Sequence, residues 1–325
     1  MDPCIGLIDQ ELARFEKRLN AELNADVELV HIIARYMATL KGKRLRPALI
    51  LLVAKASGRW NEQLIDTAVA VEMIHAATMA HDDVVDSATM RRGRETVNER
   101  WTGQTAVLMG DFLLARALRL LIEIGNLQVL SAVAHATERL SIGEIFEIQI
   151  GTQCDTREES YFAMVSDKTA SLISAAARIG AILAGASDEI VQSMGRYGES
   201  LGRAFQVADD ILDLTSDQAT MGKPVGHDLR EGKITLPLIR ALQQAPLAAR
   251  SEMEALLARP DKDEAEWAQI VAFVEEYRGV AAATETAHEC AAQAQQCLKV
   301  LAPSPARAAL ERAVQLVVER NNCRD

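Results

Sequence analysis

EMIHAATMAHDDVVDSATMRRG, residues 72–93, joins an apolar, alanine-rich run to three aspartates and two arginines. Its apolar residues recur at intervals of three and four, which is the pattern of a buried helix. Asp82 and Asp86 are four residues apart and would lie on one helix face, one turn from each other. Like charges at this spacing destabilise a helix by roughly a few tenths of a kcal/mol. The stretch therefore predicts that something outside the chain neutralises these aspartates.

The helical pattern extends over almost the whole chain of 325 residues. Ala, Leu, Met, Glu and Arg dominate, while the aromatic residues typical of strands make up only 4%. We therefore predict an all-α protein, and because no break in composition forces a second domain, we expect residues 1–325 to form a single domain. Helices are expected over 7–23, 26–40, 46–57, 61–86, 93–101, 105–122, 128–149, 158–185, 188–216, 234–244, 248–258, 264–275, 277–301 and 305–321, and a loop over 216–233.

Charge and cysteine usage narrow the class of protein. A net charge of -11 argues against nucleic acid as the main partner, since that would need a basic face. No apolar run reaches the roughly 18 residues of a membrane span, so we expect no transmembrane segment. Five scattered cysteines and an N-terminus without a signal-peptide pattern predict reduced thiols and a cytoplasmic location.

A second acidic motif echoes the first. ADDILD, residues 208–213, places Asp209 and Asp213 one turn apart at the end of another apolar helix. If the two acidic faces came together, they would form a cluster of hard oxygen ligands of the kind that Mg²⁺ prefers. A single such motif is as easily a solvated helix end, but two copies accompanied by basic residues favour a metal site.

Basic residues accompany both motifs. Arg binds phosphate through paired hydrogen bonds and Lys neutralises it as a point charge. His75 lies two turns before Asp82 and could donate to a phosphate, although a structural histidine is the alternative. Gln206 lies on the same helix face as Asp209 and Asp213 and could donate a hydrogen bond to an anion. Alternatively, it is simply a polar residue at the edge of the helix. The set predicts a diphosphate that metal ions bind on one side and basic side chains bind on the other. The other candidates for this site are Lys43, Arg44, Arg46, Arg91, Arg92, Lys168, Thr169, Lys223 and Lys233.

These residues resemble a known family, the trans-isoprenyl diphosphate synthases or polyprenyl synthetases. The resemblance runs from about residue 40 to 240, and Lys41 departs from it where Gly is commoner. The segments that carry it, in the family's order, are GKRLRP, EMIHAATMAHDDVVDSATMRRG, GDFLLARAL, KTA, FQVADDILD and GKPVGHDLREGKITLPLI. The resemblance implies an isoprenoid-synthase-type helical bundle around a deep central cavity, usually a homodimer.

The resemblance also implies a role for each motif. Several Mg²⁺ ions would bridge Asp82, Asp86, Asp209 and Asp213 to an allylic diphosphate of the farnesyl or geranyl type. Isopentenyl diphosphate would be held by Lys43, Arg46, His75 and Arg92. The allylic diphosphate would be held by Arg91, Lys168, Thr169, Gln206, Lys223 and Lys233, of which Lys168 and Lys233 are also expected to act in catalysis.

Product length is expected to depend on the residues upstream of Asp82. Family members that make short products often carry a bulky aromatic there, whereas Ala77 and Thr78 are small. Small residues leave the tunnel open, so we expect a long-chain product, most like the octaprenyl diphosphate used for quinone side chains. Lengths from hexaprenyl to decaprenyl stay open.

Other functions stay open as alternatives. A farnesyl or geranylgeranyl synthase, or the catalytic subunit of a heteromeric synthase, would carry the same motifs. A class I terpene cyclase would not need Lys43, Arg46 and His75. A non-catalytic helical subunit would usually lose an aspartate or a clamp arginine. A metal phosphohydrolase built on His81 and Asp82 would need further histidines nearby.

Overall fold

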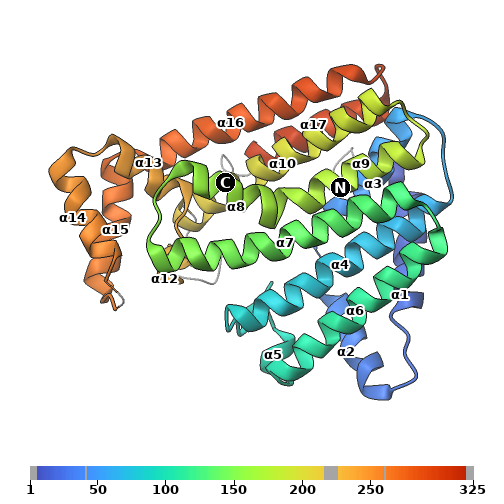
Figure 1. Cartoon of the computed structure of the whole chain (residues 1–325), viewed down its shortest axis with the longest axis horizontal. Helices are drawn as coiled ribbons and strands as arrows, with labels where there is room; N and C mark the ends of the chain where they lie inside the picture. Colours follow the sequence, from blue (N-terminus) through green and yellow to red (C-terminus); the bar gives the residue numbers. More distant parts are fainter. Residues whose placement is uncertain (1–5, 41, 216–225, 260, 320–325) are drawn as a thin grey trace. The chain divides into compact units, whose positions relative to one another are not determined.

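In a computed structural model of the chain, we describe residues 6–40, 42–215, 226–259 and 261–319. Figure 1 shows its helices in chain order. The first elements are η1 (Gly6–Ile8), α1 (Asp9–Glu22), α2 (Glu28–Thr39), α3 (Leu45–Ser57), α4 (Gln63–Val85), β1 (Met90–Arg91), β2 (Arg94–Glu95), α5 (Val97–Arg100), α6 (Gly103–Ile124) and α7 (Leu127–Gln153). The following ones are α8 (Glu158–Val165), η2 (Ser166–Ala170), α9 (Ser171–Leu183), α10 (Asp188–Thr215), α12 (His227–Arg230), α13 (Leu236–Gln244), α14 (Leu247–Leu257), α15 (Glu264–Glu276), α16 (Gly279–Cys297), η3 (Leu298–Val300) and α17 (Pro305–Glu319). The prediction of an all-α protein is confirmed.

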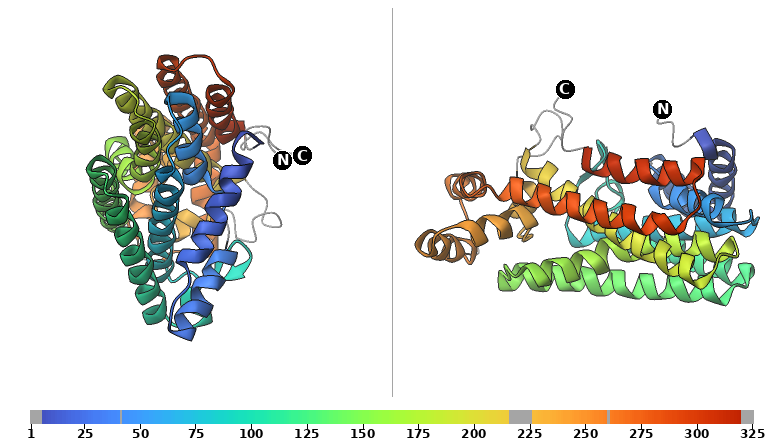
Figure 2. Two further views of the ribbon diagram at one scale, coloured as in Figure 1. Left: turned by 90° about the vertical axis from the view of Figure 1, so that its right-hand side faces the viewer. Right: turned by 90° about the horizontal axis from the view of Figure 1, so that it is seen from above.

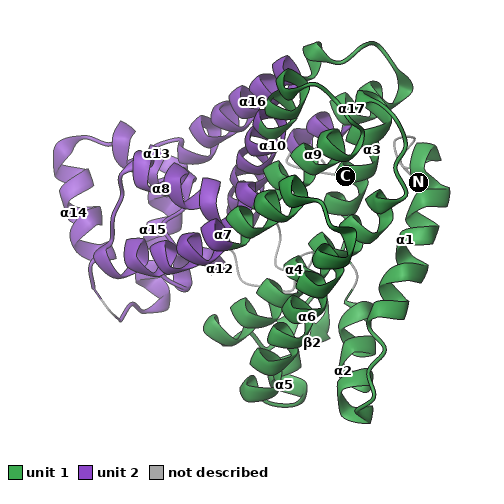
Figure 3. Ribbon diagram, turned by 45° about the vertical axis from the view of Figure 1, so that its right-hand side comes forward, with its two compact units in different colours: residues 1–137, 172–195, 298–312 green, residues 138–171, 196–297, 313–325 purple. Residues whose placement is uncertain are grey.

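The chain divides into two compact units, coloured separately in Figure 3. Unit 1 comprises residues 1–137, 172–195 and 298–312, and unit 2 comprises residues 138–171, 196–297 and 313–325. Each unit is therefore assembled from segments that are far apart in the sequence. The first aspartate motif belongs to unit 1 and the second to unit 2. That the chain forms a single domain stays a prediction.

The core of unit 1 is formed by α4 and its neighbours. α4 runs side by side with α6 and also packs against α3 and α1 (Figures 1 and 2). Val69, Ile74 and Leu113 are almost fully buried there. Because α4 is apolar nearly all round before its last turn, it is an interior helix whose end carries the acidic motif.

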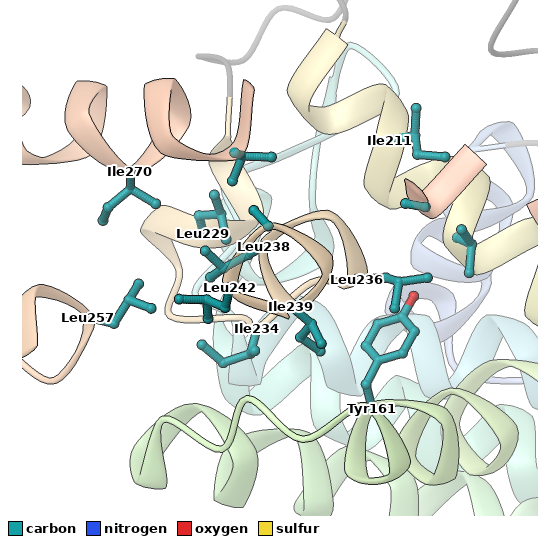
Figure 4. Close-up of a cluster of buried hydrophobic side chains, with 14 of the residues drawn as sticks. Tyr161, Ile211, Leu229, Ile234, Leu236, Leu238, Ile239, Leu242, Leu257 and Ile270 are labelled. Carbon is teal, nitrogen blue, oxygen red and sulfur yellow. The ribbon is translucent and has the colours of Figure 1, made fainter. Parts of the chain in front are cut away.

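The core of unit 2 surrounds α13. Figure 4 shows the Tyr161 ring of α8 beside Leu236, among apolar side chains that include Ile234 and Ile239. Full burial of such side chains contributes about 1.5–3 kcal/mol each to stability. This core fixes α8, α10 and α13 next to one another, and these helices carry or support the second group of candidate residues.

The ends of the helices follow from local sequence signals. Thr102 caps α6 by accepting a hydrogen bond from the Thr105 N–H at 3.0 Å. Ser304 caps α17 in the same way, accepting from the Arg307 N–H at 3.1 Å, with Pro305 as the first helical residue. Both caps satisfy N–H groups that the first turn leaves without a helical partner.

Three local predictions need correction. Instead of one helix over residues 93–101, a two-stranded hairpin comes first, with Arg92 and Gly93 at its turn in the left-handed region (φ +52° and +73°). Two such residues form the turn that tight hairpins favour. The predicted helix 158–185 is interrupted by a π-helical turn, η2, and part of the predicted loop 216–233 forms α12. Residues 216–225 of that loop lie outside the described part.

Two other expectations can be compared with the structure. Among the helices described, none is long and apolar enough to cross a membrane. Cys154, Cys290 and Cys297 form no disulfide within the described residues, whereas Cys4 and Cys323 lie outside them.

Candidate active site

The first aspartate motif forms the last turn of α4. The Asp86 N–H donates to the Asp82 carbonyl at 2.8 Å, so the helical turn is intact and the two half-buried carboxylates lie one turn apart. The C-terminal end of a helix carries a partial negative charge, which disfavours further negative charge there. A bound cation would offset this effect and also the repulsion between the two carboxylates, as the sequence pattern predicts.

Asp83, the middle residue of this motif, serves a different purpose. Its side chain is buried and accepts a hydrogen bond from Arg91 Nε at 2.7 Å. This ion pair ties the hairpin strand β1 to the end of α4. Arg91, expected to hold the allylic diphosphate, is therefore engaged by Asp83 in the structure.

An arginine cluster, formed by Arg44, Arg46, Arg91 and Arg92, surrounds His75 within unit 1. Burial and the positive charges of these arginines hold the pKa of His75 well below its ordinary value. The imidazole is thus neutral at pH 7 and can still donate one hydrogen bond. Such a concentration of cations is costly unless an anion is bound.

Arg46 and Arg92 are the members of this cluster expected to bind isopentenyl diphosphate. Arg46 Nε is buried and has no hydrogen-bond partner among the residues described. Arg92 donates from Nη1 to the Leu40 carbonyl at 2.7 Å. Lys43 is exposed just before α3. Unit 1 thus brings Arg46, Arg92 and His75 together around an unsatisfied donor.

The second aspartate motif forms the last turns of α10 in unit 2. Asp209 and Asp213 are half-buried and one turn apart. Asp213 accepts a hydrogen bond from the Asp228 N–H at 3.2 Å, at the start of α12. The carboxylate spacing thus repeats that of the first motif.

The middle residue of the second motif lies at the centre of a buried network. Asp210 accepts hydrogen bonds from Gln206 Nε2 at 2.9 Å and from the Tyr161 hydroxyl at 2.7 Å. Gln206 Oε1 in turn accepts from the Thr169 hydroxyl at 2.8 Å. Burial raises the pKa of Asp210 to about 7, although these hydrogen bonds oppose the rise. Thr169 and Gln206 are therefore brought together, each oriented by another side chain.

Lys168 lies in the π-helical turn η2, and such turns are frequent at functional sites. Its ammonium contacts Glu144 at 2.9 Å and Glu147 at 2.5 Å. Burial alone would lower the pKa of Lys168, but the two carboxylates more than offset it, and the pKa is raised. Gly143 allows this approach, because a Cβ there would lie 2.4 Å from the Lys168 backbone nitrogen.

Lys233 lines a small cavity of about 20 Å³, and its ammonium lies 2.8 Å from Glu231. The volume is enough for one water molecule. The cavity belongs entirely to unit 2, and its lining includes Tyr161, Gln206 and Asp210. Lys223 lies outside the described residues.

The predicted chain-length residues lie on α4. Ala77 is 2% exposed, and the Thr78 hydroxyl donates to the His75 carbonyl at 2.9 Å. His81, which a phosphohydrolase would use as a metal ligand, has its Nε2 3.1 Å from the Val107 carbonyl on α6. The site of a phosphohydrolase is thus not favoured.

The donor chemistry of each motif fits a divalent cation. Carboxylate oxygens are the ligands of Mg²⁺, which also retains water or substrate oxygens. No group of three or more His, Cys, Asp or Glu side chains able to hold a metal occurs in residues 6–40, 42–215, 226–259 and 261–319. Each pair of carboxylates would therefore need further ligands, as a bound diphosphate could supply.

Several supporting residues were not predicted from the sequence. Glu72, Glu144, Glu147 and Tyr161 contact predicted residues or their neighbours, yet none belongs to an acidic or basic cluster of the sequence. Tyr161 and Asp210 are 49 positions apart, so only the packing of α8 on α10 reveals their contact.

Comparisons with known proteins agree on one family. A family model described as polyprenyl synthetase matches residues 27–274. The chain is 38% identical to an all-trans-nonaprenyl-diphosphate synthase (geranyl-diphosphate specific) of Rhodobacter capsulatus, over 96% of both chains. It is 35% identical to an octaprenyl diphosphate synthase of Haemophilus influenzae, over 99% of this chain and 97% of the relative. A polyprenyl synthase of Caulobacter crescentus, solved with calcium and isoprenyl diphosphate, has a similar structure, with a TM-score of 0.92, 32% identity and 98% of both chains covered.

Proposed function

Since this chain belongs to the polyprenyl synthetase family, we propose that it is a prenyltransferase that adds isopentenyl diphosphate units to an allylic diphosphate. The arginine cluster around His75 is the observation that carries this proposal. It gathers four cations and a neutral imidazole, and the buried Nε of Arg46 has no partner among the described atoms. A diphosphate would satisfy that donor and neutralise the cluster.

We propose Lys43, Arg46, His75 and Arg92 as the ligands of isopentenyl diphosphate. Arg91, Lys168, Thr169, Gln206, Lys223 and Lys233 are the proposed ligands of the allylic diphosphate. In the structure the Lys168 ammonium is paired with Glu144 and Glu147. To bind the allylic diphosphate, it must either contact the diphosphate in addition to these carboxylates or move away from them. The raised pKa of Lys168 supports a permanently charged side chain there.

The proposed metal ions are Mg²⁺, with Asp82 and Asp86 of one motif and Asp209 and Asp213 of the other as ligands. The carboxylate spacing in both motifs supports this assignment, as does the calcium in the Caulobacter crescentus protein. Bound Mg²⁺ would supply positive charge to the leaving diphosphate. The proposed cations Lys168 and Lys233 would add fixed charge to the same leaving group.

The reaction breaks the allylic C–O bond, and the bonding electrons leave with the diphosphate. The alkene electrons of isopentenyl diphosphate form the new C–C bond to the allylic cation. The adduct then loses a proton, which restores a double bond, and we propose the released diphosphate as its acceptor. Arg46, Arg92 and His75 would hold isopentenyl diphosphate during this step, and a dry apolar environment would protect the cation from water.

We propose a long-chain product, with octaprenyl diphosphate for quinone side chains as the specific candidate. The small residues Ala77 and Thr78 support a long product, as do the nonaprenyl and octaprenyl relatives. The primer would be a farnesyl or geranyl diphosphate. A cytoplasmic location, expected from the cysteine pattern, stays a prediction.

We propose a homodimer as the assembly. Exposed apolar side chains support this proposal, because large exposed apolar surfaces often mark contacts between proteins. In unit 1, α6 exposes Leu108 and Ile122 at 59% and 68%, and in unit 2, α7 exposes Ile145 at 68%. Leu108→Asp should therefore shift the molar mass measured by light scattering toward that of one chain.

Product analysis tests the proposed activity. Purified protein would be incubated with Mg²⁺, isopentenyl diphosphate and farnesyl diphosphate, and the dephosphorylated products sized by chromatography. We expect a ladder that ends near eight isoprene units and is absent in Asp82→Ala. Geranyl and geranylgeranyl diphosphates would be tried as alternative primers.

Each alternative function gives a different result in the same assay. Products of three or four isoprene units would identify a short- or medium-chain synthase. Cyclic hydrocarbons would identify a terpene cyclase. No elongation with any primer would contradict the proposal and indicate a partner-dependent or non-catalytic subunit.

A further inference from the structure

Glu72 is a buried carboxylate beside the arginine cluster. It lies on α4, three residues before His75, and its side chain is 8% exposed. Its negative charge acts on Arg44, Arg46 and Arg92: with Glu16 it raises the pKa of Arg44 despite burial, whereas burial lowers the pKa of Arg46 and of Arg92 and the charge of Glu72 only opposes that fall. The charge of one carboxylate thus acts on three arginines in the part of the chain where diphosphate is proposed to bind.

Arg44 binds this carboxylate in the structure. Arg44 Nη1 lies 2.6 Å from Glu72, and its Nε lies 2.9 Å from Glu16 on α1. The guanidinium also lies over the Phe15 ring, 5.7 Å from the ring centroid. With one nitrogen on each carboxylate and a side chain that is 17% exposed, Arg44 is directed into the protein, while its Nη2 is buried without a hydrogen-bond partner among the described residues.

Arg46 and Arg92 make different contacts. Arg46 Nε has no hydrogen-bond partner in the described structure, and Arg92 Nη1 is bound to the Leu40 carbonyl rather than to a carboxylate. A buried donor without a partner is costly, so Arg46 would gain from any anion within reach. Glu72 is the anion whose charge acts on Arg46, and it is paired with Arg44.

We propose that Arg44 is a positioning residue that occupies Glu72 and thereby leaves Arg46 and Arg92 available for the diphosphate of isopentenyl diphosphate. This inference rests on the proposed function, because it assumes that these two arginines bind the substrate. The KGKRLRP segment thus divides its cations between two tasks: Arg44 neutralises a carboxylate of the protein, and Arg46 binds the substrate.

The reason lies in the cost of an uncompensated buried charge. Without Arg44, the Glu72 carboxylate would be left without its closest cation, which is strongly unfavourable at a buried site. The nearest remedy is an ion pair with Arg46 or Arg92. The substrate diphosphate would then have to break that pair before it could bind.

A double-mutant cycle on Arg44 and Glu72 tests this inference. Binding of isopentenyl diphosphate would be measured by calorimetry with Mg²⁺ and no allylic primer, and its KM and kcat by steady-state kinetics. We expect Arg44→Gln to weaken binding and raise the KM about tenfold, with kcat at saturation within about twofold. Glu72→Gln removes the competing charge, so we expect binding about threefold tighter.

The double variant provides the sharpest result. Arg44→Gln with Glu72→Gln should bind isopentenyl diphosphate within about threefold of the wild type, because neither the carboxylate nor its partner is left unpaired. A double variant as weak as Arg44→Gln would overturn the inference, since Arg44 would then contact the substrate or support its loop directly. Weaker binding by Glu72→Gln would also overturn it. If the ion pair were purely structural, removing either Arg44 or Glu72 would weaken binding.

Two further variants separate this inference from the proposed function. Arg18→Gln is the matched control: Arg18 pairs with Glu22 and Asp66 on the same helices, outside the arginine cluster, and its loss should leave binding unchanged. Arg46→Gln tests the site itself, and wild-type affinity in that variant would contradict the proposed function. If Arg44→Gln does not fold, the affinity of Glu72→Gln for isopentenyl diphosphate still tests the inference: tighter binding supports it and weaker binding contradicts it.

Discussion

The Tyr161 hydroxyl donates a hydrogen bond to the Asp210 carboxyl group at 2.7 Å, and both side chains are buried in unit 2. The same carboxyl oxygen accepts from the Leu236 N–H at 3.3 Å. One buried acid therefore joins α8, α10 and the start of α13. Because Asp210 lies between Asp209 and Asp213, this contact also fixes the backbone that carries the proposed metal ligands.

The raised pKa of Asp210, about 7, predicts how stability depends on pH. An unfolded chain releases this proton near pH 3.9. Between these two values the folded state holds a proton that the unfolded state has lost, so the free energy of unfolding falls as the pH rises, by about 1.4 kcal/mol per unit.

Asp210→Asn removes this titration. Between pH 5 and 7, we expect the free energy of unfolding to fall by about 2 kcal/mol more in the wild type than in the variant. Urea unfolding of the metal-free protein, with a chelator present, measures the difference. Parallel pH profiles for the two proteins would contradict the assignment. Asp155→Asn is the matched control: the Asp155 side chain is 10% exposed and hydrogen bonds from Arg157 and Ser160 hold its pKa below the ordinary value, so this variant should keep the wild-type fall between pH 5 and 7.

Close packing of α4 on α6 gives a second prediction, at Gly110. A Cβ on Gly110 would lie 2.2 Å from Nε2 of His81, so Gly110→Ala must displace the imidazole from the Val107 carbonyl. The obstacle is the far end of a side chain that is 35% exposed and can move, so the cost is that of the lost hydrogen bond, about 0.5–1.5 kcal/mol. We expect a matching fall in the free energy of unfolding, measured by urea denaturation.

The matched control removes the obstructing ring. His81→Ala combined with Gly110→Ala should be more stable than the sum of the two single effects predicts, because the new methyl group then occupies the vacated space. If the changes in the free energy of unfolding were strictly additive, the side chains at positions 81 and 110 would not be in contact.

The aspartate turns could be predicted from the sequence because their geometry is local. A spacing of four places Asp82 and Asp86 on one face whatever surrounds the helix. The turn at Arg92 and Gly93 was not predicted, because helical periodicity on both sides favours a continuous helix; Gly93, at φ +73°, was the available signal. The pairing of Arg44 with Glu72 was not readable, because it joins residues 28 positions apart through the packing of α4.

The π-helical turn that carries Lys168 was hidden for a different reason. One added residue per turn leaves the apolar pattern of the flanking helices almost unchanged, so residues 158–185 look like one continuous helix. Gly143 was the available signal, because a helix glycine that faces a backbone marks a close approach. Its partner could not be named without the structure.

The neutral state of His75 predicts which substitutions it tolerates. Its pKa is held well below the ordinary value, so the imidazole acts as a neutral donor and not as a cation. His75→Gln retains a neutral donor and should raise the KM for isopentenyl diphosphate only about threefold. His75→Ala removes the donor and should raise it about tenfold or more.

The pH dependence of substrate affinity checks the same point. With a neutral His75 in the free enzyme, the wild type and His75→Gln should show the same KM profile between pH 7 and 8. A wild-type KM that rises through this range, absent in His75→Gln, would mean that the imidazolium binds the substrate.

Ala77 provides the last prediction, on product length. It lies five residues before Asp82 on α4 and is 2% exposed, so a larger side chain must enter space next to the helix that carries the first motif. Ala77→Phe should therefore shorten the product, as chromatographic sizing of the dephosphorylated products would show. Ala77→Ser is the matched control, since it adds a single atom and should leave the product length unchanged. Because a buried phenyl ring can also strain the core by about 1–3 kcal/mol, unfolding of the variant is measured alongside. A folded, active Ala77→Phe enzyme with the wild-type product length would mean that other residues limit chain growth.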